Sequence, residues 1–214
     1  MNWFVDMVQT SIGKKLLMAL TGLGFVLFLL IHLIGNLTLY AGKDTFLSYV
    51  AHLHALDPLI RVAEIGLLVF AAVHVVTGLT LFWQNLKARP VRYQVNRWAG
   101  GRTIGSATMP YTGLIIIGFV IIHLMNFHFI DHDTQTAVFD ALSSTFASIP
   151  YVIFYTLAVL VVALHISHGF WSLFQTLGAN HPKYMPAIRG FGIGFSLLAA
   201  AGFGCIPVYV GFIM

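Results

Sequence analysis

Four histidines lie deep inside long apolar stretches of this 214-residue chain. They are His32, His74, His123 and His165. Ionisable side chains are costly inside a lipid bilayer, so they are candidates for function wherever they occur there. Imidazole nitrogens bind metal ions and exchange protons. The chemistry open to these histidines depends on which of them can meet.

Five apolar segments are each long enough to cross a membrane, which takes about 20 mostly apolar residues. They cover about residues 16–40, 58–82, 110–129, 150–174 and 188–213. Charged residues make up only 8% of the chain, against about 25% in soluble domains. Pro58, Pro110 and Pro150 are each expected in the first turn of a helix, where their missing N–H does no harm. The sequence therefore predicts one all-α membrane domain, residues 1–214, whose first four spanning helices each carry a deep histidine.

Basic residues gather on one side of the predicted membrane. The segment 87–102 holds five basic residues and no acid, and further basic residues on that side are Lys14, Lys15, Lys183 and Arg189. The opposite connection, between the third and fourth spans, holds Asp131, Asp133 and Asp140 and no Lys or Arg. Basic loops stay on the cytoplasmic side, so the N-terminus is predicted to be cytoplasmic and the C-terminus external. Segment 87–102 either only fixes this topology or also docks a soluble subunit.

The depths of the histidines follow from these directions and a rise of about 1.5 Å per residue. His32 and His123 lie 16 and 13 residues from the cytoplasmic ends of their spans, in the outer half of the membrane. His74 and His165 lie 16 and 15 residues from the external ends of theirs, in the inner half. The two levels differ by roughly 10 Å. The four histidines therefore form an outer pair and an inner pair.

An internal repeat supports this pairing. In each half of the chain the second histidine follows the first by 42 residues. The sequence around the first histidine is similar in the two halves, IHLIGN (31–36) and IHLMN (122–126). The sequence after the second is also similar, HVVTG (74–78) and HISHG (165–169). Gly78 and Gly169 each lie four residues after a histidine and thus on the same helix face. A missing side chain there makes room for a flat group beside the imidazole.

Two imidazoles from different helices at one depth suit the axial ligation of a haem iron. Zinc needs more ligands than either level offers, and no acid reaches these depths to complete a Ser-His-Asp arrangement. A lone membrane histidine is commonly a hydrogen-bonding residue between helices, but four at two matched levels favour cofactor ligation. His168, one turn after His165, is a rival ligand, and the glycine register favours His165. Cys205 is the only cysteine, which rules out an iron–sulfur site built from this chain's cysteines.

The five spans, the histidine in each of the first four and the entry sequence SIGKKLLMALTG (11–22) resemble the di-haem cytochrome b anchor of succinate:quinone oxidoreductases. This family includes succinate dehydrogenases and quinol:fumarate reductases. The resemblance implies a flavoprotein subunit with FAD and an iron–sulfur subunit on the cytoplasmic face. It also implies an inner, cytoplasmic membrane of a prokaryote and quinone, expected to be menaquinone, as the exchangeable substrate.

The same resemblance implies two b haems. Its ligand pairing carries over to His32 with His123 for the distal, outer haem, and to His74 with His165 for the proximal, inner haem. Some family members carry a glutamate two residues before the fourth ligand, for proton movement across the membrane. Ala163 stands at that position, so the resemblance does not extend to such a relay.

A quinone that exchanges protons needs hydrogen-bonding groups near a membrane face. Glu64 is the only acid within a predicted span, near its outer end, and Arg61 and His54 lie close in sequence. We expect a quinone site near Glu64, beside the outer haem. The alternative is that Glu64 and Arg61 form an ion pair at the helix end.

Haem propionates are expected to meet polar or basic groups at the inner face, with Ser11, Lys14, Arg97 and Arg102 as candidates. Two other functions remain open. The chain could be the di-haem anchor of another respiratory complex, such as a hydrogenase or a formate dehydrogenase. It could also be a non-redox transporter whose histidines bind substrate or relay protons.

Overall fold

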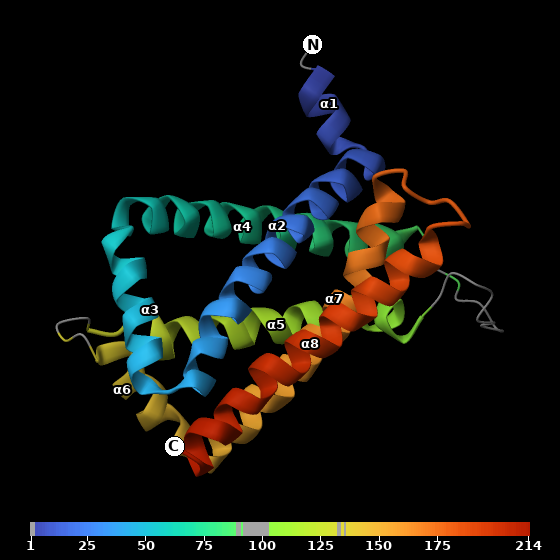
Figure 1. The fold of residues 1–214 in the computed structure, drawn as a ribbon. Coiled ribbons are helices and arrows are strands. Elements are labelled where there is room, and N and C mark those ends of the chain that lie inside the picture. Colours follow the sequence, from blue (N-terminus) through green and yellow to red (C-terminus); the bar gives the residue numbers. More distant parts are fainter. Residues whose placement is uncertain (1–2, 89–90, 92–102, 132–133, 135) are drawn as a thin grey trace.

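The computed structural model describes residues 3–88, 91, 103–131, 134 and 136–214, and these form helices without any strand (Figure 1). Five helices are long and apolar enough to cross a membrane: α2 (Ser11–Leu37, extended by the 3-10 helix η1, Thr38–Ala41), α4 (Asp57–Lys87), α5 (Ile104–Phe127), α7 (Ile149–Thr176) and α8 (Met185–Phe212). The shorter helices are α1 (Trp3–Gln9), α3 (Lys43–Ala55) and α6 (Ala137–Phe146). The prediction of an all-α protein with five spanning helices is confirmed.

The short helices α3 and α6 lie at the same end of the molecule and replace what the sequence predicts as loops (Figure 1). Each has two apolar residues four positions apart, Phe46 and Val50 in α3 and Leu142 and Phe146 in α6, and all four are buried. Side chains at that spacing share one helix face. They pack with residues of η1, α7 and α8 into one apolar cluster. The chain therefore repeats a unit of spanning helix, short helix and spanning helix: α2–α3–α4, then α5–α6–α7.

Helix α5 begins six residues before the start expected at Pro110. Thr103 caps it, accepting a hydrogen bond from the Ser106 N–H at 3.0 Å while its own N–H donates to the Ser106 hydroxyl at 2.9 Å. This capping box starts the helix upstream. Pro110 then lies inside the helix, which spanning helices tolerate better than soluble ones do. Pro58 and Pro150, in contrast, stand in the first turns of α4 and α7, as predicted.

Helices α7 and α8 pack along their length, and α2 and α5 also pack against α7 (Figure 1). Helix α4 packs mainly on α2 and buries only Thr77 and Leu81. Much of its apolar surface is exposed, including Leu68 at 71%. An apolar surface of this extent needs lipid or protein to cover it. The chain is therefore a multi-pass membrane protein whose α4 is held largely from one side.

Basic residues predominate at one end of the bundle and acids at the other, where the basic residues Lys43 and Arg61 also lie. The described basic residues at the end that carries α1 and the start of α8 are Lys14, Lys15, Lys87, Lys183 and Arg189, and Asp6 is the one described acid there. The other described acids lie in or near α3, α6 and the start of α4. Most of the basic segment 87–102 lies outside the described residues, including Arg97 and Arg102.

Candidate functional site

The inner pair joins α4 to α7. The ring centroids of His74 and His165 lie 6.5 Å apart, with the ring planes at 59°. Each ring also contacts a threonine of another helix, α2 for His74 and α5 for His165. Thr21 Oγ1 of α2 lies 3.0 Å from His74 Nδ1, and Thr112 Oγ1 of α5 lies 3.0 Å from His165 Nδ1. Four helices thus meet at this level through four side chains.

The outer pair joins α2 to α5 and is surrounded by aromatic rings. The ring centroids of His32 and His123 lie 6.0 Å apart, with the ring planes at 88°. Phe28 stacks on His32 at 5.2 Å, and Phe119 lies 5.7 Å from His123. Tyr155 of α7 contacts the His123 ring at 6.1 Å. The structure therefore brings together the two pairs that the depths along the helices predict.

Polar support differs between the two levels. At the outer level, the Asn36 amide Nδ2 lies 3.4 Å from His32 Nδ1 and donates to the His32 carbonyl at 2.8 Å. His123 Nδ1 is buried and has no hydrogen-bond partner among the described residues. A buried imidazole nitrogen of this kind ordinarily requires a partner. The inner imidazoles are the better anchored of the two pairs.

The separations fit two imidazoles on one metal. With metal–nitrogen bonds of about 2.0–2.1 Å and ring centres about 1 Å beyond each nitrogen, trans imidazoles have ring centres about 6 Å apart. The observed separations are 6.0 and 6.5 Å. Among the described residues, no group of three or more His, Cys, Asp or Glu side chains is placed to hold a metal ion. The donor set at each level is therefore two imidazoles, which suits a haem iron, whose other four ligands come from the porphyrin.

Two glycines allow helices to approach the inner imidazoles closely. A Cβ atom added to Gly22 would lie 3.5 Å from His74 Cε1, and one added to Gly113 would lie 3.6 Å from His165 Cε1. Gly78 and Gly169, which were expected to make room beside the imidazoles, differ in the space around them. Gly169 has open space on its side-chain face, whereas a Cβ at Gly78 would meet Met18 Sδ at 3.5 Å.

The threonines and glycines that support the inner pair were not predicted from the sequence. The signal was present: the dipeptide Thr-Gly occurs at residues 21–22 and again at 112–113, which is the same 91-residue offset that relates His32 to His123. Aligning the two halves on their histidines would have found both threonines.

His168, the rival to His165, lies in a different environment. Its Nδ1 is 3.4 Å from Thr103 Oγ1 at the start of α5, and its ring makes an edge contact with Trp171 at 4.9 Å. Of the two, His165 is the one whose ring pairs with His74.

The residues expected near a quinone site are only partly brought together. Arg61 forms its ion pair with Asp57 at 2.8 Å, so the ion pair considered between Arg61 and Glu64 is wrong. Glu64 instead lies 3.7 Å from His128 Nδ1, just beyond the end of α5. His54 lies exposed in the last turn of α3. This contact holds Glu64 against the end of α5, and His123 lies on the same helix, five residues before His128.

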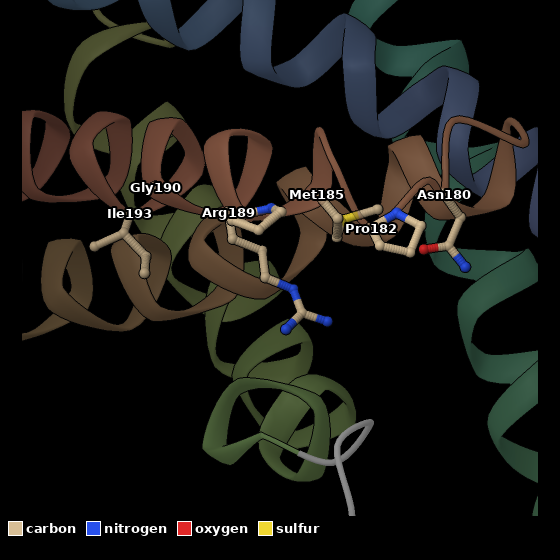
Figure 2. Close-up of a pocket in the computed structure, with 7 residues that line it drawn as sticks. Asn180, Pro182, Met185, Arg189, Gly190 and Ile193 are labelled. Carbon is tan, nitrogen blue, oxygen red and sulfur yellow. The ribbon is translucent and has the colours of Figure 1, made fainter.

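At the opposite end, Ser11 begins α2 and the Lys14 ammonium donates to the Gln9 carbonyl at 2.8 Å. Arg189 of α8 was not among the residues expected to bind propionates. Its guanidinium lies 4.4 Å from the centre of the Trp171 ring, and its Nε is buried without a hydrogen-bond partner in the described chain. Arg189 also lines an open pocket of about 630 Å³ together with Asn180, Pro182, Met185, Pro186, Gly190 and Ile193 (Figure 2). This pocket contains none of the four deep histidines.

Comparisons of the chain with protein-family models, with curated proteins and with solved structures found no match.

Proposed function

We propose that this chain is a membrane-embedded cytochrome b that carries two haems and exchanges electrons between quinone and an iron–sulfur subunit. The observation that carries the proposal is the pairing of four imidazoles at two levels. The ring centroids lie 6.0 Å apart in the outer pair and 6.5 Å apart in the inner pair. His32 and His123 would hold the outer haem, and His74 and His165 the inner one. A haem bound at either level supplies one-electron chemistry at its iron.

The protein's own residues position and insulate these groups. Helices α2, α4, α5 and α7 each supply one ligand, so the bundle fixes the separation of the imidazoles. Phenylalanines against the outer imidazoles, Phe28 and Phe119, exclude water from that level. The threonines at the inner level orient the rings.

Glu64 is proposed to accept a proton when quinol is oxidised near the outer haem. Its carboxylate is about half exposed, which gives a substrate arriving from the membrane access to it. His128 at 3.7 Å offers a second site for that proton. Arg61, paired with Asp57, and His54 lie at the same end, in the early turns of α4 and the last turn of α3.

The complex to which the chain belongs is proposed from its resemblance to the anchors of succinate dehydrogenases and quinol:fumarate reductases. The basic end of the bundle would face the flavoprotein and iron–sulfur subunits in the cytoplasm. Purification of the tagged chain from its native membrane tests this proposal. We expect FAD, iron–sulfur clusters and fumarate reduction by quinol in the same fraction. Copurifying hydrogenase or formate dehydrogenase activity would assign the chain to another complex, and a fraction without a b-type spectrum would favour a transporter.

A further inference from the structure

Thr21 and Thr112 occupy equivalent places in the two halves of the chain. Each lies 53 residues before the histidine that it contacts, and each places its hydroxyl oxygen 3.0 Å from Nδ1 of that histidine. Both hydroxyls belong to largely buried side chains, with Thr21 6% and Thr112 5% exposed. The same contact therefore occurs twice, on different helices, at the inner level alone.

The direction of these hydrogen bonds follows from the other contacts of the hydroxyls. A threonine hydroxyl has one hydrogen to donate. Each hydroxyl has two helix carbonyls within reach of that hydrogen: Leu17 at 2.8 Å and Met18 at 3.2 Å for Thr21, and Thr108 and Met109, both at 3.1 Å, for Thr112. With the hydroxyl hydrogen directed to these carbonyls, each oxygen accepts from the imidazole, and His74 and His165 then carry their proton on Nδ1.

A neutral imidazole with its proton on Nδ1 has its lone pair on Nε2, and Nε2 is then the nitrogen available to a metal. We propose that Thr21 and Thr112 lock the inner imidazoles in this tautomer and orientation, so that the inner level is prepared for haem before haem arrives. This inference rests on the proposed function. Metal-binding histidines commonly donate their second N–H to an oxygen, which fixes the ring and strengthens it as a ligand.

The outer level lacks this arrangement. His123 Nδ1 has no partner among the described residues, and the Asn36 amide nitrogen, a donor, lies 3.4 Å from His32 Nδ1 and 3.5 Å from His32 Nε2. In the part of the chain that the structure describes, no hydroxyl at that level contacts an imidazole Nδ1 as the two threonines do. The lock therefore predicts that loss of a threonine hydroxyl affects the inner haem selectively.

Valine is close to threonine in shape and removes only the hydroxyl, so Thr21→Val and Thr112→Val test the lock. Removing such a supporting group typically lowers metal affinity about 10- to 100-fold. We expect each variant to lose inner haem, with haem per chain falling from two toward one. The low-spin ferric EPR signal that disappears should be the one lost in His74→Ala. Any inner haem that remains should have a higher reduction potential, because its imidazole is a weaker donor.

Thr77→Val is the matched control. Thr77 is buried on α4, and its hydroxyl donates to the Val73 and His74 carbonyls without an imidazole contact in the described structure. This control should keep both haems, and Thr21→Ser and Thr112→Ser should restore the inner one. If the valine variants do not accumulate, alanine variants at the same positions replace them.

Valine variants with two haems, unchanged EPR signals and an unchanged inner potential would overturn the lock while leaving the proposed function intact. Loss of the whole chain from the membrane in both the valine and the alanine variants, with normal Thr77→Val, would also overturn it, because the lock predicts loss of haem and not of the bundle. A wild-type chain without haem would instead overturn the proposed function.

Discussion

Each deep imidazole sits between two helices, and its partners decide what it can bind. His32 contacts the rings of Phe28, Phe203 and His123, so aromatic rings form much of its surroundings. Burying an imidazole among such groups costs free energy unless something satisfies its nitrogens. A metal bound between the two rings would satisfy one nitrogen of each histidine.

His32→Ala should therefore remove about half of the haem, because it deletes one ligand of the outer pair and leaves the inner pair intact. The measurement is haem per chain in the purified variant, by the pyridine haemochrome assay. His52→Ala is the control, since His52 is exposed on α3 and its ring bonds the Ser48 carbonyl at 2.6 Å. Full haem retention in His32→Ala would refute the assignment of His32 as a ligand.

Glu64→Gln should slow quinol oxidation by about 10²–10⁴-fold, the range for loss of a positioned proton acceptor. The haem absorption spectrum should not change, because Glu64 contacts His128 and not the paired imidazoles. The measurement is quinol turnover by the complex in membranes, with Asp44→Asn in the first turn of α3 as the control. Unchanged turnover in Glu64→Gln would remove Glu64 from the site.

At the scale of helices, the sequence was sufficient for the five spans and insufficient for what lies between them. Long apolar stretches dominate the bilayer energetics, so length and composition alone find the spans. Helices α3 and α6 are short and gain their stability from packing at one end of the bundle, which local pattern reveals poorly. Helix α5 does not begin at Pro110 as expected, because the capping box at Thr103 begins it upstream.

The candidate site, too, could be predicted only in part from the sequence. The histidine pairs follow from helix direction and rise, which are regular and local. The contacts Thr21–His74, Thr112–His165 and Glu64–His128 depend on how neighbouring helices are rotated, and rotation is set by packing over the whole bundle. Only the internal repeat held information about the threonines.

Close packing of α5 on α7 positions Thr112 and His165 relative to each other. A Cβ added to Gly105 would lie 2.7 Å from His168 Cβ, an atom that no side-chain rotation can move away. Gly105→Ala should therefore separate these helices and cost about 1–3 kcal/mol, the usual penalty for overpacking. We expect a lower midpoint of thermal unfolding in detergent and weaker inner haem binding.

Gly118→Ala provides the comparison for that experiment, because a Cβ at Gly118, on the same helix, meets nothing within 4 Å. Alanine favours a helix over glycine by about 1 kcal/mol, so this variant should be as stable as the wild type or more so. Equal unfolding midpoints for the two variants would show that the α5–α7 contact is not tight at Gly105.

At the scale of the whole molecule, the bundle has a basic end and an end closed by α3 and α6 (Figure 1). The inner pair lies toward the basic end and the outer pair toward the closed end, where Glu64 also lies. This order places the paired imidazoles between the side proposed for the soluble subunits and the side proposed for quinone.

The most direct test of this account is the haem content of the purified wild-type chain, measured by the pyridine haemochrome assay against protein concentration. The account predicts two b haems per chain, one for each imidazole pair. A value of zero would contradict it, and a value of one would show that only one of the two pairs is a ligand pair.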